Sequence, residues 1–239
     1  MAAFPAAKGL IVNDDGWSSY ARSPAPMTPA DIARVTVEPL AGTGVIAYQF
    51  CALGGHAVNY RSRFLPRVGD LMERIDTLHV WRIRETLRHL DELGTDPLQV
   101  VAEACHRHGL ACQYSLRVND AHHIYRKADG SPYFPELLSP WFDAHRDALL
   151  PNGQLDYAHP DVHAYRLAQI EEVFREYPVD GLDLDFTRFR PWFREGAERG
   201  CAPLMTDLVR RLRDLAVERT LSGRFEYSPE VCLASGLAV

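Results

Sequence analysis

The segment Asp180–Phe189 constrains the fold of this chain more than any other, because it alternates apolar and acidic residues with the period of a β-strand. One face of such a strand carries only apolar side chains, those of Leu182, Leu184 and Phe186. The other face carries Asp183 and Asp185. Two ionised carboxylates side by side repel each other and are costly to bury. We therefore expect a compensating cation, a metal, or a part in chemistry on this face.

The composition describes an ordinary globular chain that can bury a sizeable core. It has 239 residues, of which 46% are hydrophobic and 24% charged. The formal net charge is −6 and no long basic run is present, which argues against a nucleic-acid partner. No apolar run reaches the roughly 18 residues that a membrane span needs, so we expect no membrane partner.

The five cysteines are scattered and form no C-x-x-C pair, which disfavours a disulfide framework or a zinc ribbon. The N-terminus shows no charged segment followed by an apolar stretch, so no secretory signal is visible. From both features we expect a cytoplasmic protein with free thiols. The sequence makes no prediction of oligomeric state.

Strand-like and helix-like segments alternate along the chain. We predict strands at residues 9–13, 44–50, 111–118, the acidic segment and 230–239. We predict helices at residues 28–40, 70–93, 96–108, 159–177 and 203–219. Between the third and fourth strands, residues 125–154 form a long excursion, and loops of this length are often functional.

This βα order indicates an α/β fold with a parallel sheet, either an open doubly wound sheet or a (β/α)8 barrel. No G-x-G-x-x-G follows the first strand, and inward-facing carboxylates suit a barrel mouth. About five strands are visible where a barrel needs eight. We therefore predict a parallel, TIM-barrel-like fold: one domain over residues 1–239 that forms an incomplete, C-terminally truncated barrel.

Polar residues gather where the predicted strands end, which is where both folds place their sites. The first strand ends in Asn13-Asp14-Asp15-Gly16-Trp17 and the third in Arg117-Val118-Asn119-Asp120-Ala121-His122. The acidic strand ends in Asp185 and is followed by Arg188. We expect these three ends to share one mouth.

These motifs resemble the glycosyl hydrolase-like family 10 domain. The resemblance lies in Leu155–Pro160 (LDYAHP) with the helix to Arg166, and in Val179–Phe189, which is similar to that family's D-G-I-x-L-D-[YF]-x-R-[YF] strand. It implies a TIM barrel that acts on carbohydrate. The chitinase pattern D-G-x-D-x-D-x-E fits less well, because its acidic glutamate position is Thr187, which cannot donate a proton at neutral pH.

Glycoside hydrolysis needs two carboxyl groups that flank the scissile bond. Asp183 and Asp185 lie on one strand face, about 6.5–7 Å apart from the rise per residue. We predict Asp185 as acid or nucleophile and Asp183 as its electrostatic partner. The competing interpretation is a structural ion-pair layer in which Arg117 or Arg188 neutralises the carboxylates.

The remaining candidates are predicted to bind substrate through hydroxyl contacts or stacking. They are Asp14, Asp15, Trp17, Arg117, Asn119, Asp120, His122 and Arg188. We expect a carbohydrate as partner, no cofactor and no resident metal. Two alternatives stay open: a non-catalytic carbohydrate-binding barrel, and a metal-dependent hydrolase in which several of the same carboxylates and His122 converge.

Overall fold

The computed structural model describes residues 9–53, 56–216 and 220–224. Within them, five strands form one parallel sheet in the order β1-β2-β3-β4-β5. The strands are β1 (Leu10–Asp14), β2 (Val45–Phe50), β3 (Ala111–Arg117), β4 (Gly181–Asp185) and β5 (Thr220–Arg224). The strand order follows the chain order, as it does in a TIM barrel. The predicted α/β fold with a partial barrel is confirmed.

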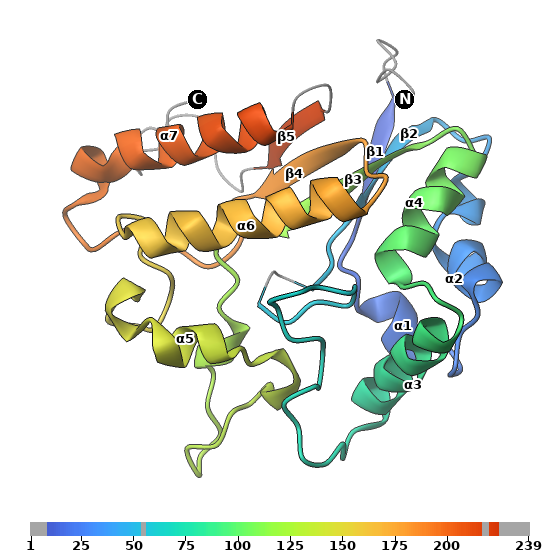
Figure 1. The fold of residues 1–239 in the computed structure, drawn as a ribbon, viewed down its shortest axis with the longest axis horizontal. Helices are drawn as coiled ribbons and strands as arrows, with labels where there is room; N and C mark the ends of the chain where they lie inside the picture. The colour runs from blue at the N-terminus through green and yellow to red at the C-terminus, as the bar shows by residue number, and fades with distance from the viewer. Residues whose placement is uncertain (1–8, 54–55, 217–219, 225–239) are drawn as a thin grey trace.

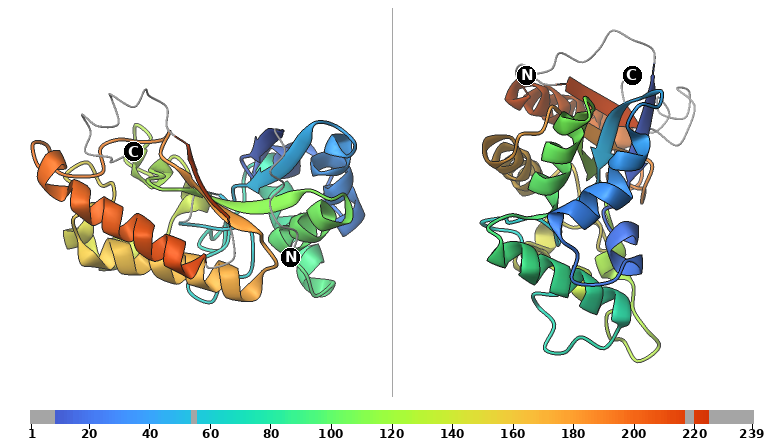
Figure 2. Two further views of the ribbon diagram at one scale, coloured as in Figure 1. Left: turned by 90° about the horizontal axis from the view of Figure 1, so that it is seen from above. Right: turned by 90° about the vertical axis from the view of Figure 1, so that its right-hand side faces the viewer.

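Helices connect the strands, and several of them lie along one side of the sheet (Figures 1 and 2). They are α1 (Ser18–Arg22), α2 (Pro29–Thr36), α3 (Leu78–Glu92), α4 (Pro97–Arg107), α5 (Pro140–Ala144), α6 (Pro160–Glu176) and α7 (Glu198–Leu215). Short 3-10 turns add η1 (Glu38–Leu40), η2 (His122–Ile124), η3 (Pro135–Leu137) and η4 (Arg146–Ala148). Figure 1 shows β1 running downward into α1, so the carboxyl ends of all five parallel strands point to the lower side.

Local sequence signals set several helix starts. Thr28 accepts a hydrogen bond from the Asp31 amide while the Asp31 side chain accepts one from the Thr28 amide, which is a capping box. Asp96 caps α4 by accepting from the Gln99 amide at 3.1 Å. A proline occupies the first turn of both helices, where its missing N–H costs nothing.

The two faces of the sheet differ in polarity. Toward the helices, Leu184 and Phe186 pack with Met205 and Leu208 of α7. The opposite face carries a polar ladder across four strands. Asn13 Nδ2 donates to Gln49 Oε1 (3.4 Å) and to Ser115 Oγ (3.2 Å), Gln49 Nε2 donates to Gln113 Oε1 (2.9 Å), and Ser115 Oγ donates to Asp183 Oδ2 (2.7 Å). The alternation predicted for the acidic strand is confirmed.

Two predicted helices need correction, and the last predicted strand cannot be compared with the structure. The helix predicted at 70–93 is helical only from Leu78, because the preceding turns are fixed by Asp70, whose carboxylate accepts from the Arg67 amide and pairs with Arg84. The helix predicted from Pro203 begins at Glu198, with the proline inside it. The fifth strand lies at 220–224, whereas residues 230–239 lie outside the described residues.

Candidate functional site

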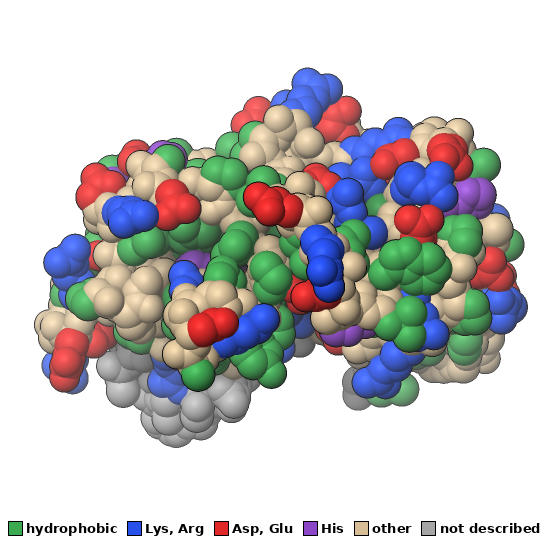
Figure 3. Space-filling model, turned by 90° about the horizontal axis from the view of Figure 1, so that it is seen from below, with side chains coloured by type: hydrophobic (Ala, Val, Ile, Leu, Met, Phe, Trp, Pro, Cys, Tyr) green, Lys and Arg blue, Asp and Glu red, His purple; other side chains and the backbone are tan. Residues whose placement is uncertain are grey.

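A cleft of about 270 Å³ lies at the carboxyl ends of the strands. Its lining brings together residues from the ends of β1, β2 and β3, from the segment after β4, from α3 and from the excursion at 125–154: Asp15, Trp17, Leu53, His79, Arg117, His122, Phe134, Glu136, Leu137 and Arg188. Five of the predicted site residues are among them: Asp15, Trp17, Arg117, His122 and Arg188. Figure 3 views the molecule from this side, where charged and apolar side chains are interspersed.

Asp15 is held as an anion at the rim of the cleft. Its Oδ1 accepts from the amides of Trp17 (2.9 Å) and Ser18 (2.8 Å), and its Oδ2 accepts from the Ser18 hydroxyl (2.7 Å). Burial on its own would raise the pKa of Asp15, but these hydrogen bonds and the charge of Arg117 outweigh it and lower the pKa. The turn depends on Gly16, whose φ of +68° and close approach to Cys51 leave no room for a side chain.

Asp120 positions His122. Asp120 Oδ1 lies 2.7 Å from His122 Nδ1 and accepts from the His122 amide at 3.1 Å, and Asp120 Oδ2 lies 3.4 Å from Arg117 Nη1. Burial would raise the pKa of Asp120, yet the His122 contact and nearby positive charge hold it well below the ordinary range. With Nδ1 engaged, Nε2 is the imidazole nitrogen that a ligand in the cleft can reach.

Glu136, which the sequence analysis did not single out, is the second carboxyl group of the cleft. Its residue is only 6% exposed, and its carbonyl accepts from the Gly69 amide at 2.9 Å, which ties η3 to the segment before α3. Burial raises the pKa of the Glu136 carboxyl, against the opposing hydrogen bond of its own amide and the nearby His79. The cleft therefore holds two carboxyl groups, Asp15 and Glu136, whose environments shift their pKa values in opposite directions.

Aromatic rings form much of the cleft wall. Trp17 lies against His79 with 5.6 Å between ring centroids, and His122 meets the edges of Phe134 (5.1 Å) and Phe189 (5.2 Å). Arg188 lies over the Phe189 ring at 5.3 Å. Rings with an apolar face beside hydrogen-bonding groups suit a ligand that is itself amphipathic.

Backbone strain also gathers here. Two residues other than glycine in the described part of the chain have a positive φ: Leu53 (67°), which lines the cleft, and Phe189 (51°), which contacts the cleft residue His122. Such conformations cost about 1–3 kcal/mol each and are found preferentially at binding and catalytic sites.

Asp185 and Asp183 lie behind the cleft rather than in its lining. Asp185 is the register partner of Arg117, so both side chains leave the sheet on the face that the cleft occupies. Its Oδ1 accepts from the Thr187 amide at 2.9 Å and from the Thr187 hydroxyl, and the residue is 4% exposed. Asp183 lies two residues earlier on β4 and is fully buried. Its Oδ2 accepts a hydrogen bond from the Ser115 hydroxyl.

Two other predicted residues point elsewhere. Asp14 lies on the opposite face of the sheet from Asp15, where its Oδ2 accepts from the Tyr48 hydroxyl and burial raises its pKa. Asn119 is buried and donates to the Pro191 carbonyl at 2.8 Å, which links the end of β3 to the segment after β4. Neither side chain lines the cleft.

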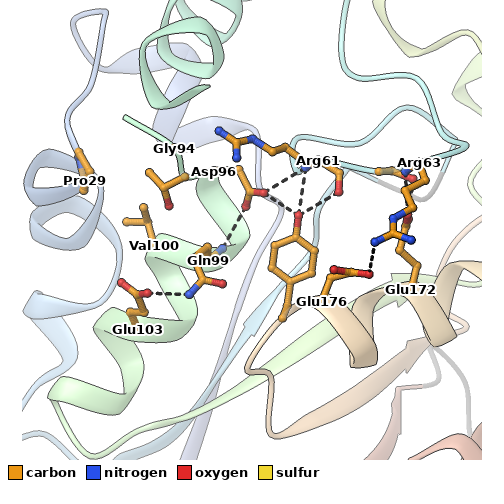
Figure 4. A pocket seen from close by; sticks show the side chains of 13 residues that line it. Pro29, Arg61, Arg63, Gly94, Asp96, Gln99, Val100, Glu103, Glu172 and Glu176 are labelled. Atoms are coloured by element: carbon orange, nitrogen blue, oxygen red, sulfur yellow. Dashed lines mark hydrogen bonds and ion pairs between the residues drawn. The ribbon is translucent and has the colours of Figure 1, made fainter. Parts of the chain in front are cut away.

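A larger cavity of about 590 Å³ lies between α4, α6 and the segment 61–63 (Figure 4). Several of its polar groups are bonded to one another. Asp96 accepts from the Tyr177 hydroxyl at 2.6 Å, and Arg63 pairs with Glu176 at 2.8 Å. The first bond joins the start of α4 to the end of α6, and the second joins the segment 61–63 to α6. The lining of this cavity does not include the ends of the strands.

The described part of the chain shows neither a metal-ligand group nor a membrane-spanning helix. No group of three or more His, Cys, Asp or Glu side chains in that part of the chain has the arrangement of a metal site. None of the helices described has the length and apolar character required to cross a bilayer.

Comparison with known proteins relates the fold to glycosidase barrels. No protein-family model matches the chain, and no curated protein matches it either. Among solved structures, a maltogenic alpha-amylase from Thermotoga neapolitana aligns over 94% of this chain with a TM-score of 0.53 and 13% identity. A GH36 alpha-galactosidase from Geobacillus stearothermophilus aligns over 91% with a TM-score of 0.52 and 13% identity.

The galactosidase domain of an alpha-galactosidase-sucrose kinase aligns over 91% of the chain with a TM-score of 0.52 and 15% identity. This chain spans 47% of the amylase and 28% and 27% of the two galactosidase chains. At these identities the likeness concerns the fold alone. The chain therefore has a partial (β/α)-barrel fold that is similar to part of these structures.

Proposed function

We propose that this chain is a glycoside hydrolase-like protein that binds a carbohydrate in the cleft at the carboxyl ends of its strands, with Asp185 as acid or nucleophile. The observation that carries the proposal is the lining of that cleft. Two carboxyl groups, two imidazoles and two guanidinium groups line it together with Trp17 and Phe134. Sugar rings combine hydroxyl groups with apolar C–H faces, so this lining complements them.

Two further observations support the proposal. In TIM barrels the active site lies at the carboxyl ends of the strands, which is where the cleft is. The motif around β4 resembles that of glycosyl hydrolase-like family 10, and it places Asp185 beside Arg117 at the end of the strand. On the basis of this motif we propose that the chain is related to that family.

One observation favours a second candidate, a non-catalytic carbohydrate-binding barrel. The Asp185 carboxylate is almost buried, and one of its oxygens holds the turn at Thr187. A carboxylate fixed in this way serves structure as well as it serves catalysis. The two candidates predict different results for a variant that removes the charge of Asp185 and keeps the shape of its side chain.

The test is a panel of oligosaccharides and aryl glycosides offered to the wild type, to Asp185→Asn and to the control Asp143→Asn, whose carboxylate lies on the surface. A catalytic Asp185 predicts that turnover falls at least about 100-fold in Asp185→Asn and stays within twofold in the control. Equal turnover by all three proteins removes Asp185 from the mechanism. Binding without turnover by the wild type, unchanged in Asp185→Asn, establishes the binding barrel instead.

A further inference from the structure

The cleft holds a protonatable group that the proposed function does not yet use. Glu136 lines the cleft from the excursion at 125–154, although its residue is only 6% exposed. Its neighbours in the lining are Phe134, Leu137 and the imidazoles of His79 and His122. A carboxyl group placed among rings and apolar side chains, yet open to a cleft, has the setting that favours a proton donor.

We propose that Glu136 is the proton donor of this cleft, giving its proton to the glycosidic oxygen of a bound sugar. The inference rests on the proposed function and adds to it the acid that the reaction requires. It leaves to Asp185 the role of nucleophile, which requires the sugar to reach past the cleft lining to the face that Asp185 shares with Arg117. In the first step the Asp185 carboxylate bonds to the anomeric carbon, the bond to the glycosidic oxygen breaks, and that oxygen takes the Glu136 proton.

In the second step a water molecule attacks the anomeric carbon and displaces Asp185. The Glu136 carboxylate takes a proton from that water, so the protein returns to its starting state and one water molecule is consumed. No oxidant, metal or cofactor enters the balance. Asp15, which is held as an anion on the β1 side of the cleft, is left to accept hydrogen bonds from sugar hydroxyls.

The charged groups around Glu136 are consistent with this assignment. Its carboxyl faces His79 of α3, His122 of η2 and Asp76, which precedes α3. The cleft lining also includes Asp15 and the guanidinium groups of Arg117 and Arg188. Burial outweighs the positive neighbours and keeps the pKa of Glu136 above its ordinary value, so the carboxyl retains its proton into a higher pH range than a surface glutamate does.

The position of Glu136 is also fixed. The Gly69 amide holds its carbonyl, and the neighbouring Phe134 ring packs against His122, which Asp120 orients in turn. A proton donor must be held within hydrogen-bond reach of the oxygen that it serves. The contacts of η3 therefore hold the backbone that carries this carboxyl group.

The test uses two aryl glycosides of the sugar that the wild type hydrolyses fastest. One has a dinitrophenyl leaving group, which departs without protonation, and the other has a phenyl group, which needs a proton. Glu136→Gln is expected to lose about 100- to 10,000-fold in kcat/KM on the phenyl glycoside and less than tenfold on the dinitrophenyl glycoside. Asp185→Asn is expected to lose activity on both, because the nucleophile is needed whatever the leaving group.

Three outcomes overturn the inference. If Glu136→Gln loses the same factor in kcat/KM on both substrates, or loses activity on neither, Glu136 is not the proton donor. The proposed function still stands in that case if the wild type is active. If the wild type hydrolyses neither substrate, the hydrolytic function fails and the inference fails with it. Glu38→Gln, on the surface away from the cleft, is the matched control and should equal the wild type on both.

The pH profile gives a second readout that a merely structural role would not move. On the phenyl glycoside, wild-type kcat/KM should fall as pH rises through the pKa of Glu136, and this limb should be absent in Glu136→Gln. A limb that persists in the variant assigns the titration to another group and overturns the proposal. A urea midpoint of Glu136→Gln at least as high as that of the wild type at the assay pH excludes misfolding as the cause of lost activity.

Discussion

Replacing Asp120 by asparagine keeps the shape of the side chain and removes its charge, which tests whether Asp120 organises the cleft. The carboxylate lies 3.4 Å from the Arg117 guanidinium and 2.7 Å from His122 Nδ1, and its side chain is 6% exposed. At an effective dielectric constant of 20, one ion pair at 3.4 Å is worth about 5 kcal/mol before desolvation is subtracted. Breaking a buried pair by neutralising one partner costs about 3–5 kcal/mol.

We therefore expect Asp120→Asn to lower the free energy of unfolding by about 3 kcal/mol at neutral pH. Urea denaturation followed by circular dichroism measures it, and with a slope of about 3 kcal/mol/M the midpoint should fall by about 1 M. Asp143→Asn makes the same chemical change in a surface pair whose partners are 79% and 82% exposed. That control should lose less than about 0.5 kcal/mol.

The stability difference between wild type and Asp120→Asn should also depend on pH. Because the pKa of folded Asp120 lies below its ordinary value of 3.8, its stabilisation is present above that pH and is lost as pH falls through the folded pKa. The difference between wild type and Asp120→Asn should therefore shrink as pH falls below 3.8 toward the folded pKa. A difference at neutral pH no larger than that of Asp143→Asn would refute the argument.

Three further predictions concern the ladder, the turn and the buried acid. Ser115→Ala removes a donor to the Asp183 carboxylate and should cost about 2 kcal/mol, lowering Tm by about 4–8 °C in calorimetry. Gly16→Ala should cost more than about 2 kcal/mol, since its Cβ would lie 1.8 Å from a carbonyl oxygen; Gly42→Ala, with a similar φ and open space, should cost about 1 kcal/mol. Burial raises the pKa of folded Glu136 above its ordinary value of about 4.5. The stability of the wild type relative to Glu136→Gln should therefore fall as pH rises from about 4.5 through the folded pKa. Urea titrations in which this relative stability rises with pH would contradict the prediction.

The sequence predicts the first four strands well, and the acidic strand most clearly, because alternation of acidic and apolar residues has the period of a strand. Leu184 and Asp183 fall on opposite faces as predicted, since no other regular structure separates neighbours in that way. Helix starts were predicted less accurately. Pro203 suggested a first turn, but the helix begins at Glu198, because a proline near the start removes only one backbone hydrogen bond.

The cleft could be predicted only in part. The residues at strand ends, such as Asp15 and Arg117, meet because parallel strands end at one edge of the sheet. Asp14 shows the limit of this reasoning, because adjacent residues of a strand point to opposite faces. Glu136 comes from a long excursion without periodicity; the length of that excursion was the one signal that it carries function.

The most direct test of the central claim is the crystal structure of this chain soaked with the sugar that it binds best. We predict density for the sugar in the cleft between Asp15 and Glu136, with an apolar ring face toward Trp17. Density in the larger cavity between α4 and α6 instead, or no density in the cleft at a saturating concentration of a sugar that binds in solution, would contradict the account.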